Sequence, residues 1–336
     1  MTGGQRPWRR AVTGASGFVG SHLVARLARD GYQVVGLDEV PVPREADFRC
    51  GATDISTEGD FSFRQCDLAV NELVPLLRDV DTVFHLAGVS GVRESWGSRY
   101  ADYVHANILG TQRLLEACRE AGVRRVVVAS SSSVYGSTVR PSRIEDLPQP
   151  VSPYGVSKLA VERLALAYAE VSSFDACILR YFTVYGPYQR PTMLMSRILQ
   201  AAHTGHPVTV FGDGSQRRHF TYVDDAVEAT VLAGTRPLTG SHVVNVAGPR
   251  SASVSEVLAV AESVIGAPIR VHHGESQAGD VTASEADLSE AYALLGYRPR
   301  TDLAEGIAEH WECYHADATV HTVSSRIAAT ATGGAL

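Results

Sequence analysis

The feature that most constrains the fold of this chain is a glycine-rich turn close to its start. Glycines recur at every third position from Gly14 to Gly20, directly after a short strand-like stretch at residues 10–13. An amphipathic segment at residues 21–30 follows the turn, and an apolar segment at residues 33–38 follows that. A strand, a glycine turn, a helix and a second strand in this order predict a βαβ unit with two parallel strands.

Strand and helix patterns continue to alternate through the rest of the chain. The later strands are expected at residues 82–86, 125–130, 176–181, 208–211 and 242–246, and the helices at about 104–121, 154–171, 192–204, 224–233 and 253–265. A weak last helix is expected near 303–315, and the loops at 40–62 and 136–152 are expected to cross the edge of the sheet. The alternation predicts an α/β fold, in which helices cover both faces of a doubly wound parallel sheet.

The composition excludes several classes of protein. The formal net charge is −7, so no basic surface is expected to bind a nucleic acid. The apolar runs are shorter than the roughly 20 residues that a membrane span needs, and no secretory leader is recognisable. The five cysteines are widely spaced without a Cys-x-x-Cys pair, and no histidine has a metal-ligand partner at good spacing. We therefore expect a cytoplasmic protein with no disulfide framework, no metal site and no membrane partner.

The glycine turn is of the type that holds a dinucleotide. Gly14, Gly17 and Gly20 permit a tight turn and a close approach of the backbone to a pyrophosphate, which then faces the N-terminus of the helix. The next strand ends at Asp38, whose carboxylate can accept two ribose hydroxyls and would repel a 2′-phosphate. The pattern predicts NAD in preference to NADP. The alternative is a glycine turn with a purely structural role.

Lys158 is the only lysine among 30 basic residues, and the other 29 are arginine. A general exchange of lysine for arginine would leave a lysine where a compact ammonium is needed. Tyr154 lies four residues earlier, on the same face of the expected helix, where a nearby ammonium would lower the pKa of its phenol. A phenolate can act as a base toward an alcohol. The alternatives are a lysine retained by chance and an ordinary exposed pair.

A run of serines, Ser130 to Ser133, stands at the end of the expected strand at 125–130. In a parallel sheet this is the carboxyl edge, where ligands bind. A hydroxyl at this edge could share a proton with a substrate alcohol. The alternative is a plain polar loop.

Together these residues resemble the extended short-chain dehydrogenase/reductase family, and within it the NAD-dependent nucleotide-sugar epimerases and dehydratases. The resemblance covers about residues 10–312 and includes further motifs in order: Cys66-Asp67-Leu68, His85-Leu86-Ala87-Gly88, Asn107-x-x-Gly110-Thr111, residues 180–187, residues 212–225 and Leu295-Gly296-Tyr297. It implies a Rossmann-type NAD-binding domain at 1–181 plus about 222–247. A smaller C-terminal α/β domain at about 182–221 plus 248–315 would bind the nucleotide sugar. Residues 316–336 are rich in Ala, Thr, Ser and Gly without periodicity, which by itself predicts a flexible tail.

The resemblance also implies a role for individual residues. Tyr154 would remove the proton of the sugar 4-hydroxyl, Lys158 would also hold the nicotinamide ribose, and Ser131 matches the catalytic Ser/Thr. The residues that match the family's NAD contacts are Gly14, Gly17, Phe18, Val19, Asp38, Asp67, Leu68, Leu86, Ala87, Gly88, Ser130, Tyr154, Lys158 and Tyr181. Those that match its substrate contacts are Ser90, Arg93, Ser131, Ser132, Ser133, Tyr154, Thr183, Arg190, Arg218 and Asp280. NAD would be held tightly, and reduced and reoxidised within each turnover.

The chain departs from the family's pattern where the diphosphate is expected. Arg218 matches the arginine that meets the diphosphate, but His219 stands where the family usually has an aspartate. The family often has a second phosphate-binding arginine before a C-terminal Gly-Asp pair. Residues 275–278, which precede Gly279 and Asp280, contain no arginine.

The reaction depends on the side chains next to the 4-keto sugar that oxidation at C4 forms. Dehydratases of the family place Asp and Glu directly after the catalytic hydroxyl residue, and decarboxylases place Glu two residues after it. This chain has Ser132 and Ser133 there, which is similar to 4-epimerases. Thr183 and Arg190 resemble the uronate type, because a hydroxyl and a guanidinium suit a sugar carboxylate. In the same segment, Tyr188 and Thr192 replace a usual Arg and Asp.

We therefore expect a UDP-glucuronate 4-epimerase that forms UDP-galacturonate through a transient 4-keto intermediate. The alternatives are a UDP-glucose or other UDP-hexose 4-epimerase or another nucleotide-sugar modifying enzyme, such as a decarboxylase or dehydratase. A different class, a non-catalytic NAD-binding regulator, is opposed by the intact Tyr154, Lys158 and Ser131. By analogy with the family, the helices near 104–121 and 154–171 are expected to form a homodimer.

Overall fold

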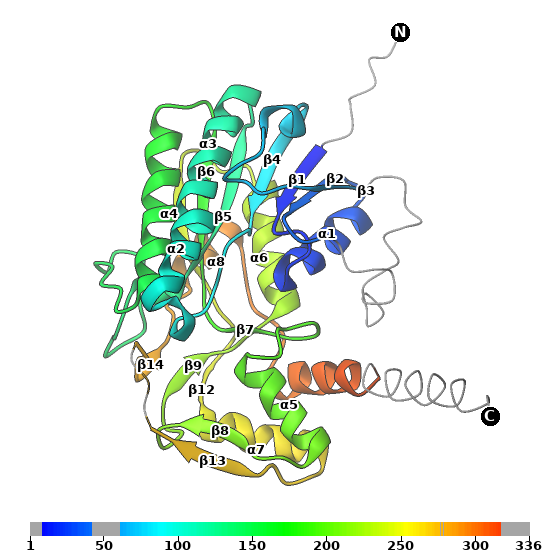
Figure 1. The fold of residues 1–336 in the computed structure, drawn as a ribbon, viewed down its shortest axis with the longest axis vertical. Coiled ribbons are helices and arrows are strands. Elements are labelled where there is room, and N and C mark those ends of the chain that lie inside the picture. The colour runs from blue at the N-terminus through cyan, green and yellow to red at the C-terminus, as the bar shows by residue number, and fades with distance from the viewer. Residues whose placement is uncertain (1–8, 42–60, 276, 278, 317–336) are drawn as a thin grey trace, which may run out of the picture.

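The computed structural model describes residues 9–41, 61–275, 277 and 279–316, and it shows two parts of unequal size (Figure 1). The larger part, at the top of Figure 1, is built on one parallel sheet. The smaller part below it contains short strands and the helices α5 (Leu194–Thr204) and α7 (Val254–Ile265). Most of the predicted loop at 40–62 and all but residue 316 of the predicted tail lie outside the described residues.

The large sheet has seven strands in the order β11-β6-β5-β4-β1-β2-β3, and every neighbouring pair is parallel. The strands are β1 (Arg9–Thr13), β2 (Gln33–Asp38), β3 (Phe61–Gln65), β4 (Val80–His85), β5 (Arg125–Ser131), β6 (Asp175–Tyr181) and β11 (His242–Val246). The chain winds outward from β1 to β3 and then crosses to β4 on the other side of β1. Such a sheet binds ligands where the strand order reverses, outside the carboxyl ends of the strands. The predicted Rossmann-type doubly wound fold is confirmed.

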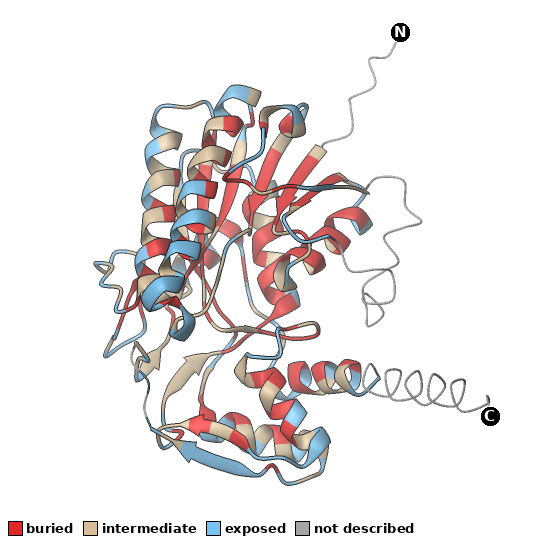
Figure 2. Ribbon diagram, viewed as in Figure 1, coloured by how far each residue is buried: buried red, intermediate tan, exposed pale blue. Residues whose placement is uncertain are grey.

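Helices cover both faces of the large sheet, because successive strand residues point to opposite sides. Val12 packs in the cluster that includes α1 (Phe18–Arg29) and α6 (Val223–Thr235). The preceding residue, Ala11, packs in the cluster that includes α3 (Gly110–Ala121) and α4 (Pro153–Glu170). The strands between these two layers are buried, as Figure 2 shows.

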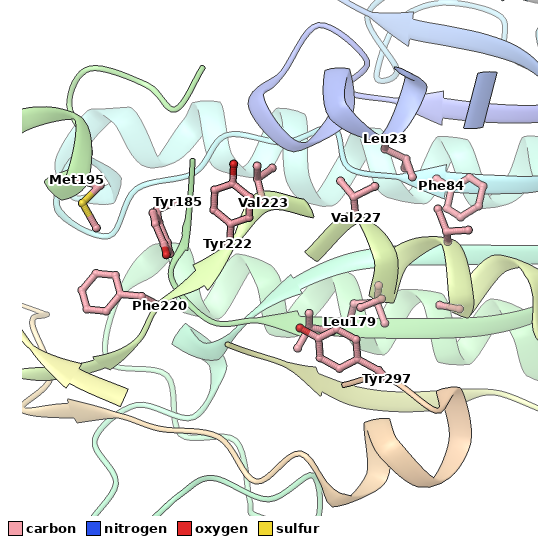
Figure 3. Packing of buried hydrophobic residues seen from close by; sticks show 14 of the residues in the cluster. Leu23, Phe84, Leu179, Tyr185, Met195, Phe220, Tyr222, Val223, Val227 and Tyr297 are labelled. Atoms are coloured by element: carbon pink, nitrogen blue, oxygen red, sulfur yellow. The ribbon is translucent and has the colours of Figure 1, made fainter. Parts of the chain in front are cut away.

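The first of these clusters continues from the large sheet into the smaller part. Figure 3 shows it passing from Leu23 and Phe84 to Tyr185 and Phe220. One apolar core therefore holds the two parts together. Four of the five cysteines, Cys66, Cys118, Cys177 and Cys313, are buried, and Cys50 lies outside the described residues.

The smaller part contains three short sheets. They pair β8 (Val208–Phe211) with β13 (Val271–Gly274), β9 (Arg217–His219) with β12 (Ser251–Ser253) and β14 (Ala283–Ser284), and β7 (Val184–Tyr185) with β10 (Thr221–Tyr222). A last helical stretch covers residues 303–316. Single 3-10 turns connect other elements, at Val74–Leu77, Arg93–Ser95, Gly97–Arg99 and Ser132–Val134.

Several elements differ from the prediction. Strand β3 was not predicted, because its last residues Arg64 and Gln65 are polar and exposed at the sheet edge. Residues 208–211 form a strand, but it lies in a small sheet of its own with β13 and not in the large parallel sheet. Helix α8 (Ser289–Leu295) packs against β11 and α6. A piece of the predicted second domain thus lies on the first.

The predicted helix at 104–121 is part of a longer composite helix. It starts as α2 (Tyr100–Tyr103), continues through a π-helical segment, η6 (Val104–Leu109), and ends as α3 before Gly122. The predicted start at residue 104 therefore lies inside the helix, at the first residue of the π-helical segment. No helix within the described ranges has the length and apolar character that crossing a bilayer requires.

Candidate active site

A cavity of about 540 Å³ lies where the carboxyl ends of β1, β4, β5 and β6 meet the smaller part of the molecule. Most of the predicted site residues line it: Gly14, Gly17, Phe18, Val19, Leu86, Gly88, Ser90, Arg93, Ser130, Ser131, Ser132, Ser133, Tyr154, Lys158, Tyr181, Thr183, Arg190, Arg218 and Asp280. Four predicted residues are not in its wall: Asp38, Asp67, Leu68 and Ala87. The fold therefore brings together side chains that are far apart in the sequence.

The glycine turn forms one end of the cavity. Gly14 has a φ of +72°, and a Cβ there would lie 2.7 Å from the backbone nitrogen of Ala87. A Cβ on Gly20 would lie 1.9 Å from the carbonyl oxygen of Gly14. Helix α1 starts at Phe18 with neither a side-chain cap nor an acidic residue in its first turn. Its first N–H groups and the positive end of its dipole thus suit a phosphate.

Asp38 and Asp67 lie beyond the cavity wall, next to the glycine turn. Asp38 ends β2, and its carboxylate accepts hydrogen bonds from the N–H groups of Ser16 (2.9 Å) and Val40 (3.0 Å). Asp67 follows the neighbouring strand β3. Burial raises the pKa of Asp67, but hydrogen bonds from His105 (2.9 Å) and the Ala69 N–H (2.8 Å) outweigh this and hold it below its usual value. Two carboxylates therefore lie at the edge where an adenosine would follow the pyrophosphate.

The N-terminus of α4 places Tyr154 and Lys158 in the cavity. Ser152 caps the helix by accepting a hydrogen bond from the Gly155 N–H (3.1 Å), so Tyr154 lies in the first turn and Lys158 one turn later. Lys158 is 7% exposed, and its Nζ donates to the carbonyl oxygen of Ala129 at the end of β5 (2.9 Å). Ser131, two residues further along β5, lines the same wall.

The pKa of Tyr154 differs from the prediction. Burial raises the pKa of Tyr154 above its usual value, and a hydrogen bond with Ser131 and the charge of Arg190 oppose this rise. The expected lowering by Lys158 is not found, and the Lys158 ammonium donates to the Ala129 carbonyl. Burial also lowers the pKa of Lys158, to about 8, against the charge of Glu162.

The segment after β6 carries Thr183 and Arg190 to the same end of the cavity. The Arg190 guanidinium donates to the hydroxyl of Ser90 (2.5 Å), which follows β4. The turn between Thr183 and Arg190 contains two residues with a positive φ, Gly186 (+145°) and Tyr188 (+63°). Thr183 and Arg190 therefore line the same cavity as Tyr154, and Arg190 is close enough for its charge to act on Tyr154.

Arg93 and Arg218 also line the cavity, close enough for their charges to interact. Arg93 forms an ion pair with Asp280 (2.7 Å) and stacks over the ring of Phe211 (4.2 Å). Burial and the charge of Arg93 lower the pKa of Arg218, and Asp280 opposes this. His219, which replaces the family's aspartate, accepts a hydrogen bond from the Ala286 N–H on Nδ1 (2.8 Å). Two guanidinium groups thus face the region where a diphosphate would lie.

Comparison with known proteins agrees with this geometry. The profile of the NAD dependent epimerase/dehydratase family matches residues 11–247. The chain belongs to this family. The predicted class of enzyme, an NAD-dependent nucleotide-sugar epimerase, and its NAD cofactor are thereby confirmed.

The proteins to which this chain is similar include both UDP-glucose epimerases and UDP-glucuronate 4-epimerases. An uncharacterized UDP-glucose epimerase of Bacillus subtilis (strain 168), YtcB, is 40% identical over 88% of this chain and 94% of its own. The structure of MoeE5 in complex with UDP-glucuronic acid and NAD has a TM-score of 0.86 at 43% identity, covering 92% of this chain and 99% of its own. The UDP-glucuronic acid 4-epimerase from Bacillus cereus, in complex with UDP-glucuronic acid and NAD, has a TM-score of 0.85 at 38% identity. That match covers 91% of this chain and 98% of the other.

The residues of this family member fit NAD. Side chains at Gly14 and Gly20 would clash with the backbone, so these glycines permit the tight turn at which α1 begins and which lines the cavity. The uncapped N–H groups of α1 would hold the pyrophosphate, and Asp38 has oxygen atoms for a ribose. Among the residues that the structure describes, no three His, Cys, Asp or Glu side chains are grouped to hold a metal ion.

The sequence does not by itself reveal the buried residues that hydrogen-bond to the cavity wall from behind. Ser130, a predicted NAD contact, points its hydroxyl away from the cavity and donates to Glu162 (2.5 Å). Glu162 also pairs with Arg180. Arg180 is part of a motif of the resemblance, and Glu162 is in none. The available signal was spacing, because Glu162 follows Lys158 by four residues on the same helix face. Glu94 and Gln189 also line the cavity and were not predicted.

Proposed function

We propose that this protein is a UDP-glucuronate 4-epimerase, which interconverts UDP-glucuronate and UDP-galacturonate. The observation that carries the proposal is Arg190, whose guanidinium lies at the sugar end of the cavity, bonded to Ser90 and close to Tyr154. Ser132 and Ser133 line the cavity at the two positions where dehydratases and decarboxylases of the family carry acidic residues. The two structural relatives that hold UDP-glucuronic acid support the same substrate.

The proposed chemistry starts at the sugar 4-hydroxyl. Tyr154 takes its proton, Ser131 hydrogen-bonds the tyrosine oxygen, and Lys158 supplies a positive charge within the buried wall. A bound NAD would supply the acceptor and donor of the C4 hydride. Because the hydride returns to the opposite face of the sugar ring, the 4-keto ring must turn within the cavity before reduction. Tyr154 then returns the proton to the new 4-hydroxyl.

A 4-keto uronate is a β-keto acid, which loses CO₂ when its carboxylate bond aligns with the carbonyl π system. Arg190 and Thr183 would hold the carboxylate out of this alignment through charge-assisted and neutral hydrogen bonds. Arg218 and Arg93 would bind the diphosphate of the substrate. The ion pair with Asp280 would hold Arg93 in position when no substrate is bound. In this way Arg93 would supply the second phosphate-binding arginine that the segment before Gly279 lacks.

The test is a product assay with two substrates and one variant. Wild-type protein is given UDP-glucuronate or UDP-glucose separately, and NMR resolves epimerised products while CO₂ is quantified. Arg190→Ala is expected to weaken UDP-glucuronate binding by about 1.5–3 kcal/mol, the usual value of a hydrogen bond to a charged group, and to raise the fraction released as a decarboxylated 4-keto pentose. Thr183→Ala should act in the same direction by about 0.5–1.5 kcal/mol.

The control is Arg119→Ala, which removes an exposed arginine of α3 that pairs with Glu116 and should leave both quantities unchanged. A second candidate function, UDP-hexose 4-epimerase, is favoured by Tyr188 and Thr192, which replace the Arg and Asp of the uronate-type segment. If Arg190→Ala keeps its affinity for UDP-glucuronate and its product ratio, this second function takes precedence.

A further inference from the structure

A buried acidic side chain lies one helical turn beyond Lys158. Glu162 is 1% exposed, and it follows Tyr154 and Lys158 at intervals of four residues along α4. All three side chains therefore lie on the helix face that packs toward β5 and β6. Glu162 does not line the cavity, and the proposed chemistry does not use it.

Glu162 ties the helix to two neighbouring strands. Its Oε1 accepts hydrogen bonds from the Ser130 hydroxyl (2.5 Å) and from Nε of Arg180 (2.9 Å), and its Oε2 accepts one from Nη2 of Arg180 (2.8 Å). Ser130 of β5 and Arg180 of β6 are register partners in the sheet. One carboxylate thus fixes α4 to both strands at the level directly before Ser131.

The network continues away from the helix. The Arg180 guanidinium stacks over the ring of Tyr135 (4.7 Å), and the Tyr135 hydroxyl donates to Oδ1 of Asn245 (2.7 Å). The Asn245 amide donates to the carbonyl oxygens of Ser142 (2.8 Å) and Asp287 (3.1 Å). A buried chain of polar contacts therefore connects the catalytic helix to the segment that enters the smaller part.

Lys158 contacts the strand next to this network. Its Nζ donates to the carbonyl of Ala129, the residue before Ser130. The ionisable groups that interact electrostatically with it are Glu162 from its own helix and His85 from β4. Glu162 is the carboxylate of the two, and it is itself paired with Arg180 of β6. A buried ammonium is disfavoured by desolvation, and an opposite charge nearby offsets that cost.

We infer that Glu162 is a positioning residue for Lys158: its carboxylate anchors the carboxyl end of β5 under α4 and keeps the Lys158 ammonium protonated. The inference rests on the proposed function only in that a charged Lys158 assists Tyr154. Burial alone would lower the pKa of Lys158 further than the value of about 8 that it has with Glu162 in place. Loss of the carboxylate should therefore neutralise the lysine at a lower pH.

The sequence itself makes a direct measurement possible, since Lys158 is the only lysine in the chain. Protein produced with ¹³Cε-labelled lysine, with any affinity tag removed, gives one side-chain signal that needs no assignment. Its chemical shift is followed against pH in purified wild-type protein as isolated, without substrate. In Glu162→Gln the titration midpoint is expected to fall by on the order of one pH unit, because the charge that opposes the desolvation of Lys158 is removed.

The matched control is Glu170→Gln, which removes the same charge from an exposed position at the end of α4 and should not move the midpoint. Glu162→Asp keeps a charge but withdraws it by one methylene, so it should give a smaller shift in the same direction. This variant serves if Glu162→Gln does not fold, as judged by circular dichroism. Turnover should follow the titration, with a lower kcat, an unchanged KM and an alkaline limb that moves with the Lys158 midpoint.

An unchanged midpoint in a folded Glu162 variant would overturn the inference. If the midpoint falls while wild-type protein epimerises neither UDP-glucuronate nor UDP-glucose, the inference stands and the proposed function fails. The two ideas can therefore fail separately.

Discussion

At the residue scale, the chemistry depends on a few ionisable side chains that are buried and still hydrogen-bonded. Burial raises the pKa of Tyr154, and its hydrogen bond with Ser131 and the charge of Arg190 oppose this rise. Its ring meets that of Tyr103 edge-on, at 6.1 Å between centroids. The phenol is thus held by packing as well as by hydrogen bonds, so its oxygen can be removed without displacing the ring.

Tyr154→Phe should therefore reduce turnover by about 10²–10⁴-fold, the usual value of a positioned general base, and leave the affinity for NAD and UDP-glucuronate unchanged. Turnover is followed by NMR and binding by calorimetry. Tyr168→Phe is the control, because it removes a hydroxyl from the same helix at a site that contacts Glu116 and Gln112 instead. A Tyr154→Phe protein with normal turnover would show that another group is the base.

His85 is a second buried residue whose protonation state the fold determines. Thr111 donates its hydroxyl proton to the Asn107 carbonyl, so its oxygen must accept from Nε2–H of His85 (2.8 Å). Nδ1 then accepts from the Thr13 hydroxyl (2.8 Å). Burial, with the charge of Lys158, lowers the pKa of His85 to about 3. The ring stays neutral and fixes the loop that follows β4.

Two buried neutral histidines predict how stability depends on pH. Burial lowers the pKa of His310 to about 4, and that of His85 to about 3, whereas a histidine in the unfolded chain takes up a proton near pH 6.5. Below that pH the unfolded state binds more protons, so the free energy of unfolding falls by roughly 1.4 kcal/mol per pH unit for each histidine. The loss continues down to the folded pKa values.

Urea denaturation at about pH 7 and about pH 5 measures this loss. In His310→Gln the loss should be smaller than in wild type by about 2 kcal/mol, because one of the two groups no longer titrates. His206→Gln, at an exposed histidine, should behave like wild type. Equal losses in wild type and His310→Gln would show that His310 does not stay neutral in the fold.

At the element scale, the connections after the strands position the site more than the strands do. The π-helical segment η6 turns Asn107 inward, where it is 1% exposed. Its Oδ1 accepts from the Val89 N–H (2.8 Å), and its amide donates to the Val89 carbonyl (3.0 Å) and to Ser157 (3.0 Å). One side chain thus joins the loop after β4 to the catalytic helix. Such π-turns are frequent at functional sites.

The turn between β1 and α1 gives a sharp test of element packing. In Gly20→Ala the new Cβ would lie 1.9 Å from the Gly14 carbonyl oxygen, so the turn must open and NAD should be lost. In Gly110→Ala the nearest atom outside its own helix lies at 3.5 Å, an ordinary contact. This control should keep NAD and gain about 0.5–1 kcal/mol, as alanine does over glycine inside a helix.

The readout is the NAD content of an extract of each purified protein after denaturation, together with its thermal midpoint. Stoichiometric NAD in Gly20→Ala would mean that the backbone relaxes and that the close contact is not required. A lower thermal midpoint in Gly110→Ala would contradict the expectation that the helix accepts a Cβ at this position.

The elements that the sequence predicts well are those whose ends are marked clearly. The strand at 242–246 matches β11, and the helix at 253–265 matches α7 within one residue, because apolar runs and capping residues mark their ends. Strand β3 escapes prediction since an edge strand needs no apolar alternation on its exposed side. The strand at 208–211 has the right apolar pattern, but pattern does not say which sheet it joins.

The same distinction applies to the site. Gly14, Tyr154 and Lys158 are recognisable because local spacing fixes their relation. The pair of Arg93 and Asp280 joins residues 187 positions apart, so only the folded chain shows that these two residues meet. Glu162 and Arg180 belong to the same class, since their pairing depends on the register of two strands with a helix.

At the scale of the whole molecule, the cavity lies between two parts that contact across it. Arg93 belongs to the loop after β4, and Asp280 belongs to the segment that leads into β14. Their ion pair is partly exposed, with side chains 41% and 27% accessible, so it contributes little to stability on its own. Its position across the cavity is what matters, because a diphosphate would compete with Asp280 for the guanidinium.

The outer surface of the composite helix and α4 predicts self-association. Val104, Leu109 and Val156 are 39%, 43% and 45% exposed there, and such neighbouring apolar side chains favour an interface between copies. We expect a homodimer by light scattering, and a monomer for Leu109→Glu. Val171→Glu, at an exposed position beyond the end of α4, is the control and should remain a dimer. A monomeric wild-type protein, or a dimeric Leu109→Glu, would contradict this interface.

The burial of Lys158 has a consequence for amine chemistry on this protein. Acylating and cross-linking reagents that react with lysine find a single side-chain target, and that target is enclosed in the wall of the cavity. Surface coupling, enzymatic acetylation and ubiquitin attachment therefore have no lysine to use elsewhere on the chain. The rate at which such a reagent modifies Lys158 would then report how often the cavity is open, and a bound nucleotide sugar should slow it.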